Sequence, residues 1–320
     1  MPGTNPFSDA LKKAAPIILD GGLATELEAQ GAKLHESLWS AAHLHSDPEA
    51  IVKAHLAYLE AGASCIISAS YQATRKGLMT LGISADEADA LIVRSVGLAQ
   101  EARDRFVAAN PQAQQQILIA ASIGPYGAAL HDGSEYVGAY GVSKAALREF
   151  HEQRLHLLDA SGADVLACET IPDFQEIVVL CELLRTVTTP AWVSFSCADG
   201  QHISDGTAIS DCAALFIDHP KVLALGVNCT PPQYIPALIG ELKAAATDKA
   251  IIVYPNSGER YEAETNTWHG TSTPVECALA AQEWLRAGAK IIGGCCRMGP
   301  KHIRQMHERI AKPGSPILLS

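Results

Sequence analysis

The sequence has no concentration of positive charge. Among its 320 residues, 24 Lys and Arg stand against 35 Asp and Glu, which gives a formal net charge of −11. No run of Lys and Arg exceeds two residues, as at Lys12 and Lys13. Because proteins that bind nucleic acids and other polyanions carry clustered basic residues, we expect no nucleic-acid partner.

Long hydrophobic runs are also missing. No uninterrupted apolar run approaches the ~18 residues of a membrane span, and the opening MPGTNPFSDALKKAA lacks the apolar segment of a signal peptide. Charged residues make up 18% of the chain and hydrophobic residues 48%, so a large apolar core is expected rather than a disordered chain. We therefore expect a globular, enzyme-sized protein in the cytoplasm.

The nine cysteines do not have the pattern of a secreted disulfide scaffold. Their number is odd and they are spread from Cys65 to Cys296. A reducing compartment is expected, with most of the thiols serving as small buried side chains. Any thiol with a chemical role must stand out by its position.

Short apolar runs alternate with helical patterns along the chain. The runs have the character of strands buried on both faces of a parallel sheet. The expected strands are 16–19, 65–69, 117–122, 164–168, 191–196, 222–227, 250–254 and 290–293. The expected helices are 48–61, 85–109, 143–160, 173–186, 210–218, 233–246, 273–287 and 300–310. Eight strands thus alternate with eight helices.

A weak internal repeat supports this count. The segments YLEAGASCII, LLDASGADVLA and WLRAGAKIIGG each end a helix at Gly-Ala and enter a strand. Dividing 320 residues among eight units leaves about 40 for each. We predict an α/β fold, a single (β/α)8 barrel of the TIM type, as one domain over 1–320 with its core at about 16–311. An open, doubly wound sheet is the alternative, because periodicity does not establish closure.

In a parallel barrel the active site lies at the C-terminal ends of the strands. Three thiols follow such ends, Cys229 after the sixth strand and the pair Cys295 and Cys296 after the eighth. Three thiolates with one open position are a ligand set of catalytic zinc. Both adjacent thiols can reach one ion if the strand breaks into a turn, which Gly293 and Gly294 favour. Buried structural thiols or a redox-active pair are the alternatives.

Two carboxylates, Asp20 and Glu169, follow the first and fourth strands. Either could bind a substrate ammonium, act as a general base or cap the following loop. If Glu169 points into the barrel, its neighbour Cys168 points outward to the helices. Several aromatic side chains could face a cation, namely Trp39, Tyr71, Tyr126, Tyr136 and Trp268.

These strand-end segments resemble those of the zinc-dependent homocysteine S-methyltransferases. The resemblance runs from Asp20 to His302 through DGGLATELEAQG, SASYQAT, GPYGAALHDGSEYVGAY, ACETIPDFQE, SDGT, GVNC, YPNSGE and GGCCR. GVNC and GGCC carry the similarity to the metal-binding family. SYQAT, GSEY and YPNSGE are similar to the S-methylmethionine branch rather than the betaine branch.

The resemblance implies a set of site residues. It implies that Cys229, Cys295 and Cys296 bind one zinc ion per chain, with the homocysteine sulfur in the open fourth position. Asp20 and Glu169 correspond to the family's ligands for the homocysteine amino group. The implied substrate-binding residues are Asp20, Gly21, Glu169 and Thr170, with Tyr71, Glu135 and Asn256 as candidates on the donor side.

The implied reaction transfers a methyl group to the homocysteine thiol and yields methionine. A metal deprotonates a coordinated thiol outright, so no general base is required. A sulfonium donor leaves as a neutral thioether, which favours S-methylmethionine first, S-adenosylmethionine second and betaine third. All eight units are used by about Ile310, so we expect no cobalamin or folate module. The expected partners are therefore small-molecule substrates, and the sequence does not indicate an oligomeric state.

Other functions stay open at this point. Within the family, a betaine-dependent enzyme or a methyltransferase for selenocysteine or another thiol is the alternative. A metal-storage or redox protein could use the three thiols but would not need the carboxylates. An aldolase or phosphate-processing barrel would need a strand-end Lys or a glycine-rich phosphate loop, neither of which we find.

Overall fold

The computed structural model describes residues 5–33, 38, 40–112, 116–245, 248–258, 260–262, 267–269 and 273–311, with the backbone alone for 260–262 and 267–269. One sheet contains eight parallel strands in the order β1-β10-β7-β6-β5-β4-β3-β2. They are β1 (Ile17–Ile18), β2 (Cys65–Ile67), β3 (Leu118–Ile123), β4 (Val165–Ile171), β5 (Ala191–Phe195), β6 (Val222–Asn228), β7 (Ala250–Tyr254) and β10 (Ala289–Ile292). Each lies on one of the eight predicted runs.

The sheet closes on itself between its first and last strands in the pairing order. A parallel bridge joins Leu19 to Cys65, and the Asp20 N–H donates to the Cys65 carbonyl at 3.0 Å. The fold is therefore a single TIM-type barrel. The open-sheet alternative is wrong.

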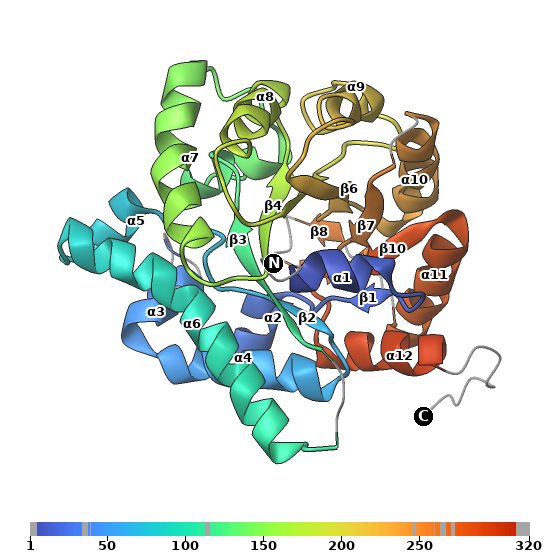
Figure 1. The fold of residues 1–320 in the computed structure, drawn as a ribbon, viewed down its shortest axis with the longest axis horizontal. Coiled ribbons are helices and arrows are strands. Elements are labelled where there is room, and N and C mark those ends of the chain that lie inside the picture. The colour runs from blue at the N-terminus through green and yellow to red at the C-terminus, as the bar shows by residue number, and fades with distance from the viewer. Residues whose placement is uncertain are drawn as a thin grey trace.

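Helices surround the strands (Figure 1). Those at the predicted positions are α4 (Pro48–Glu60), α6 (Ala85–Ala109), α7 (Lys144–Asp159), α8 (Phe174–Leu183), α9 (Ile209–Ala214), α10 (Ile235–Ala244), α11 (Pro274–Ala287) and α12 (Pro300–Ala311). Side-chain caps fix many of their starts, including capping boxes at Ser84 and Thr273. In the part of the chain described, no helix combines the length and hydrophobicity needed to cross a membrane.

Several short elements were not predicted. They are the helices α1 (Pro6–Lys12), α2 (Leu23–Ala29), α3 (His43–Ser46) and α5 (Arg75–Met79), four 3-10 turns, and the hairpin strands β8 (Arg260–Glu262) and β9 (Thr267–His269). Each helix is at most seven residues long. Two turns of helix give too few repeats for a 3.6-residue pattern to stand out.

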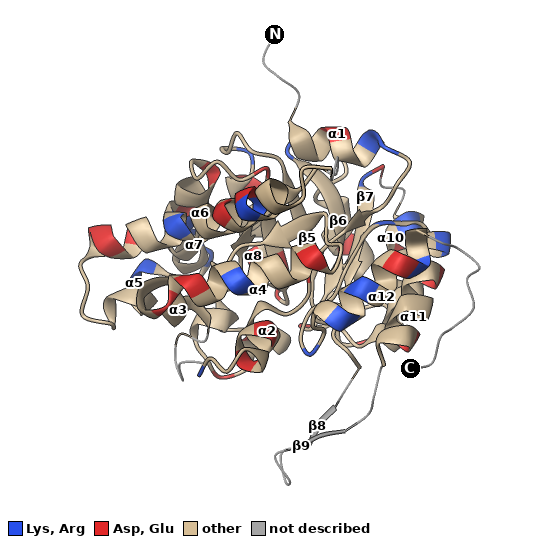
Figure 2. Cartoon of the chain, turned by 90° about the horizontal axis from the view of Figure 1, so that it is seen from below, with Lys and Arg blue, Asp and Glu red and all other residues tan. Residues whose placement is uncertain are grey.

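The apolar residues form two layers. An outer layer lies between the sheet and the helices, and it includes Cys168, as predicted for a side chain next to an inward-pointing Glu169. An inner layer fills the barrel and includes Phe7 of α1, whose ring centroid lies 5.9 Å from that of Trp192. Figure 2 shows α1 at one end of the barrel and α2 near the other. Helix α1 therefore closes the end opposite the C-terminal face.

Candidate active site

The three predicted thiols converge beyond the strand ends. Cys229 follows β6, and Cys295 and Cys296 lie beyond the end of β10 at Ile292. All three Sγ atoms lie within 4.8 Å of one another. The Cys296 sulfur lies 3.7 Å from that of Cys229 and 4.0 Å from that of Cys295, and Cys229 and Cys295 form a disulfide.

A turn after β10 brings both adjacent thiols to this position. The Met298 N–H donates to the Cys295 carbonyl at 3.1 Å. The two glycines before the thiols are needed for space, since neither has a positive φ. A Cβ at Gly293 would lie 2.5 Å from the Leu19 Cβ, and one at Gly294 would lie 2.6 Å from the Met298 Cβ. The predicted break of the strand is present, but close packing requires the glycines rather than backbone freedom.

Strained backbone also shapes the cluster. Cys229 has a φ of 46° and Arg297 a φ of 66°, in the left-handed region that non-glycine residues rarely occupy. Such a residue costs about 1–3 kcal/mol and persists where its surroundings fix it. At Cys229 the left-handed conformation occurs directly after β6, where the thiol approaches the sulfurs of Cys295 and Cys296.

The donor set fits a thiophilic metal ion once the thiols are reduced. In a tetrahedral site with metal–sulfur bonds of about 2.3 Å, the sulfurs lie about 3.8 Å apart. The separations of Cys296 from the other two sulfurs, 3.7 and 4.0 Å, match that spacing. The disulfide between Cys229 and Cys295 must be open for all three to act as ligands.

The two predicted carboxylates are buried in the barrel mouth. Asp20 is 2% exposed, and its Oδ2 accepts from the Ile67 N–H at 2.8 Å. Its Oδ1 is buried and has no hydrogen-bond partner among the described residues. Glu169 is 6% exposed and accepts from the Ser122 hydroxyl at Oε1 and from the Tyr254 hydroxyl at Oε2, the latter at 3.0 Å.

Burial dominates the protonation of both acids. It raises the pKa of Asp20 well above its ordinary value, and the charge of Glu169 raises it further, while the Ile67 hydrogen bond opposes the shift. Burial raises the pKa of Glu169 to about 7 against the two hydrogen bonds that lower it. A buried carboxyl group becomes ionised only where a positive charge or hydrogen-bond donors stabilise the carboxylate. A substrate ammonium has the charge and the N–H donors to stabilise both.

A polar network that the strand pattern did not reveal supports Glu169. The Trp192 indole N–H donates to the Tyr254 hydroxyl at 3.1 Å, and the Ser194 and Tyr254 hydroxyls lie 2.7 Å apart. The Asn228 amide donates to the Thr170 hydroxyl at 2.7 Å, and the Thr170 N–H donates back to Asn228 at 2.7 Å. The sequence signal for this network is the presence of polar residues within otherwise apolar strands, from which buried hydrogen bonds could have been predicted.

Thr170 is held in a strained backbone conformation next to this network. Its φ is 62°, in the left-handed region. The hydrogen bonds with Asn228 fix both its N–H and its hydroxyl. Gly21 has a different reason to be glycine, because a Cβ there would lie 2.0 Å from the Met298 carbonyl oxygen. Gly21 therefore allows the first loop to pack against the thiol-bearing turn.

A pocket of about 310 Å³ opens beside the thiols. Its lining includes Tyr136, Cys229, Asn256 and Cys296. The Tyr136 hydroxyl lies 4.0 Å from the Cys296 sulfur. Of the predicted donor-side residues, Asn256 lines this pocket, whereas Tyr71 and Glu135 do not.

Tyr71 and Glu135 lie close to the pocket wall. The Tyr71 phenol interacts with the Thr170 side chain and with Tyr136. The Glu135 Oε2 is buried without a hydrogen-bond partner in the part of the chain that the structure describes, and burial raises the pKa of this carboxyl.

The other aromatic candidates are placed differently. Tyr126 packs against Tyr140 and Phe150, with ring centroids at 5.4 and 5.1 Å. Trp39 and the side chain of Trp268 lie outside the described residues.

The closed barrel, with convergent thiols and buried acids at its C-terminal face, defines an enzyme of the TIM-barrel class whose chemistry lies at the strand ends. The homocysteine S-methyltransferase family matches residues 17–310, and the chain belongs to that family. It is 50% identical over 305 residues to the homocysteine S-methyltransferase YbgG of Bacillus subtilis, covering 94% of this chain and 96% of that protein.

A second relative and solved structures agree. The chain is 44% identical to a selenocysteine Se-methyltransferase of Brassica oleracea var. italica, over 92% of this chain and 88% of that protein. The metallated form of the homocysteine methyltransferase MmuM from Escherichia coli superposes with a TM-score of 0.85 and 44% identity, covering 95% of this chain and 100% of that one. Its oxidized form has the same TM-score. The chain is therefore a homocysteine S-methyltransferase.

Proposed function

We propose that the protein transfers a methyl group from a sulfonium donor, S-methylmethionine before S-adenosylmethionine, to the thiol of homocysteine, giving methionine. The observation that carries the proposal is the convergence of Cys229, Cys295 and Cys296 within 4.8 Å, beside a mouth containing two buried acids. We propose that these thiols hold one zinc ion per chain, since soft thiolates select such a metal. Their need to stay reduced is consistent with a cytoplasmic location.

Zinc at this site would supply a deprotonated, electron-rich acceptor sulfur at neutral pH. The residues of the chain then have to orient the acceptor. Asp20 and Glu169 bind the ammonium group of homocysteine, and the buried Asp20 Oδ1, unpaired within the described residues, supports this role. Gly21 follows Asp20 and packs against the thiol-bearing turn, and Thr170 follows Glu169 in a left-handed conformation, so both help to position the acids.

Tyr71, Glu135 and Asn256 form the donor side. The donor carries a positive sulfonium centre, which the Glu135 carboxylate, with its buried Oε2, would attract and the Tyr71 ring beside Tyr136 would stabilise. Asn256 lines the pocket next to the thiols. Transfer from a sulfonium joins a positive donor to an anionic sulfur and releases a neutral thioether. Charge therefore disappears along the reaction, which a water-poor pocket favours.

Selenocysteine is the second candidate acceptor. The 44% identical Brassica enzyme is named for that activity, and a selenol reacts by the same displacement. The two acceptors share an ammonium and a carboxylate. The buried acids therefore suit both.

The test measures kcat/KM for homocysteine methylation with S-methylmethionine, S-adenosylmethionine and betaine at equal concentration, together with zinc per chain. We expect S-methylmethionine to be the best donor, S-adenosylmethionine the second and betaine the poorest, with one zinc bound per chain. A preference for betaine, or a requirement for added cobalamin, would refute the donor assignment.

The same assay tests the acceptor site when selenocysteine and 3-mercaptopropionate replace homocysteine. Because 3-mercaptopropionate lacks the amino group, we expect it to be a far poorer acceptor. Equal methylation of the two thiols would mean that Asp20 and Glu169 do not bind the ammonium.

A further inference from the structure

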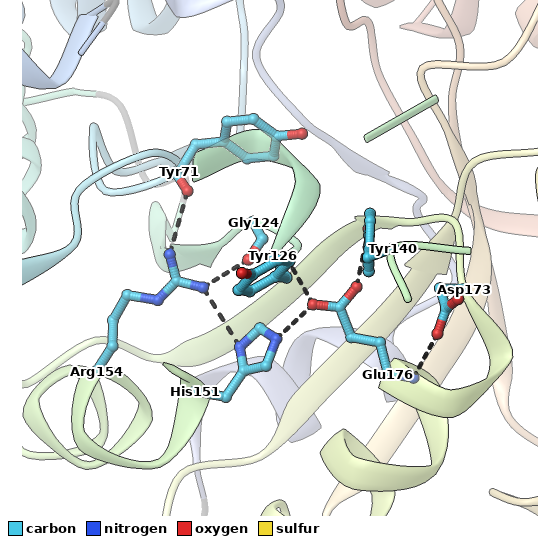
Figure 3. Close-up of polar contacts among 8 residues, drawn as sticks. All are labelled: Tyr71, Gly124, Tyr126, Tyr140, His151, Arg154, Asp173 and Glu176. Carbon is cyan, nitrogen blue, oxygen red and sulfur yellow. Dashed lines mark hydrogen bonds and ion pairs between the residues drawn. The ribbon is translucent and has the colours of Figure 1, made fainter. Parts of the chain in front are cut away.

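A buried charged cluster lies beside the site and is not part of the substrate-binding set (Figure 3). Arg154 and His151 come from α7 and Glu176 from α8. His151 and Glu176 are fully buried, and Arg154 is 3% exposed. Burying charged groups carries a desolvation cost that apolar side chains of similar volume would avoid. The presence of buried charges here therefore calls for another role.

The hydrogen bonds define how the charges are joined. Arg154 Nη2 donates to His151 Nδ1 at 3.3 Å, so the imidazole proton resides on Nε2. That Nε2–H donates to Glu176 Oε1 at 2.6 Å. Burial lowers the pKa of His151, which agrees with a neutral ring. A neutral histidine thus connects a buried cation to a buried anion.

The other hydrogen bonds of this cluster lead to the loops at the barrel mouth. Arg154 donates to the Gly124 carbonyl at 2.5 Å and to the Tyr71 carbonyl at 3.4 Å. Glu176 Oε1 accepts from the Tyr126 N–H at 2.6 Å. One charged cluster thereby ties the loops that follow β2 and β3 to α7 and α8 (Figure 3).

Tyr71 connects this cluster to the pocket. Its carbonyl accepts from Arg154, while its phenol lies against Thr170 and near Tyr136. Gly124 packs closely against the Tyr71 ring, since a Cβ at Gly124 would lie 2.8 Å from two of its ring carbons. In Figure 3 the phenol points away from the guanidinium.

We propose that Arg154, fixed by His151 and Glu176, is a positioning residue that holds Tyr71 in place for methyl transfer. The proposal rests on the function proposed above, since it takes Tyr71 as part of the donor side. Arg154 itself does not touch the substrates. It acts through the backbone of Tyr71 and Gly124.

A double-mutant cycle tests the connection. We compare wild type, Arg154→Met, Tyr71→Leu and the double variant by kcat/KM for the sulfonium donor. Tyr71→Leu removes the aromatic ring, and Arg154→Met is expected to misplace it. Because misplacing a substrate-facing group by about 1 Å lowers rates by up to about 100-fold, we expect each single change to lower kcat/KM by about 10- to 100-fold. We expect the double variant to be no worse than Arg154→Met. Multiplicative effects would overturn the proposal.

Two further variants serve if Arg154→Met does not fold. Arg154→Lys keeps the positive charge but replaces the forked guanidinium by a single ammonium group, and we expect it to recover part of the lost kcat/KM. Glu176→Gln removes the anion with little change of shape, and we expect a loss in the same direction as Arg154→Met. Wild-type donor kinetics in Glu176→Gln would overturn the proposal.

His219→Gln is the matched control. His219 is also a buried histidine, and its ring lies 3.0 Å from the Cys181 carbonyl in the connection before β6, away from the mouth. We expect it to lower Tm and leave donor kinetics unchanged. Donor kinetics as impaired as those of Arg154→Met would show that general destabilisation explains the effect. If wild type itself lacks methyl transfer from sulfonium donors, the proposed function fails instead.

Discussion

Glu169 is the residue at which function and stability oppose each other. Its carboxyl is 6% exposed, and its charged form has two hydroxyl donors but no cationic partner among the described residues. Burial therefore raises its pKa to about 7. In the proposed acceptor complex an ammonium supplies the missing positive charge. The site is thus arranged for a bound substrate rather than for the empty pocket.

The pH dependence follows from this pKa. Below about pH 7 Glu169 becomes protonated and loses the charge with which it would bind the ammonium in the proposed complex. We expect kcat/KM for homocysteine to fall as the pH is lowered through 7, and Glu169→Gln to remove that limb while lowering activity. A pH–rate profile of both proteins measures this. An unchanged acidic limb in the variant would assign it to another group.

The raised pKa of Glu169 also affects folding stability, and its effect on stability with pH is opposite to its effect on activity. A carboxyl with a pKa raised in the folded state favours folding at low pH, and this contribution is lost as the pH rises from about 4.5 to about 7. At pH 8 Glu169→Gln should therefore be more stable than wild type, by up to about 3 kcal/mol at about 1.4 kcal/mol per pKa unit. Urea unfolding at pH 4 and 8 measures the difference, which should shrink at pH 4.

The three thiols give a third prediction at the residue scale. Replacing Cys229, Cys295 or Cys296 by Ser should reduce bound zinc below stoichiometry and lower activity by about 100-fold or more, because each would supply one of the three proposed ligands. Metal analysis of the purified variants measures this. The control Cys181→Ser, whose thiol donates to the Leu215 carbonyl, should keep its zinc. Full zinc occupancy in all three ligand variants would refute the metal site.

At the scale of elements, α1 closes the end of the barrel opposite the active site. Its start is capped by Asn5, whose side chain accepts from the N–H groups of Phe7 and Ser8. Phe7 is fully buried against Trp192, and Trp192 donates to Tyr254, which donates to Glu169. A helix of seven residues thus supports the floor of the site.

Phe7→Ala should lower the free energy of unfolding by about 3–5 kcal/mol, the usual range for removing a buried aromatic ring. Chemical denaturation measures it. Lys12→Ala in the same helix is the control, since the Lys12–Asp9 ion pair is exposed and should contribute less than about 1 kcal/mol. Equal, small effects would show that α1 does not stabilise the barrel.

At the scale of the whole molecule, the closed eight-stranded sheet and the apolar layer between it and the helices lead us to propose a single domain over 1–320. Far-UV circular dichroism follows the outer helices, whereas tryptophan fluorescence includes Trp192 inside the barrel. We expect both signals to change with the same midpoint in denaturant. Two separate midpoints would contradict a single cooperative domain.

Residues of both charge signs occur on the outer helices. In Figure 2 the ribbon segments of Lys and Arg lie among those of Asp and Glu. The net charge of −11 is therefore not concentrated on one face in that view. This arrangement agrees with small-molecule substrates entering at the strand ends.

Local sequence patterns specify the repeating units of the fold. Strands and long helices are local patterns of apolar residues, so all eight of each lie where they were predicted. The family motifs pointed to the thiols and acids near the strand ends. Glu169, predicted to follow the fourth strand, instead lies within β4, because that strand extends to Ile171. Short helices such as α1 and α2 lacked enough repeats to be recognised.

Barrel closure, the thiol cluster and the buried polar contacts depend on the tertiary structure, because each joins residues that are distant in the sequence. Closure rests on Leu19 meeting Cys65, and the thiol cluster on Cys229 meeting residues 66 and 67 positions later. Arg154 and Tyr71 are 83 positions apart, so no local pattern predicts their hydrogen bond. The pKa of Glu169 likewise depends on burial by several strands. Local patterns fix which elements form, whereas desolvation and long-range packing fix what their side chains can do.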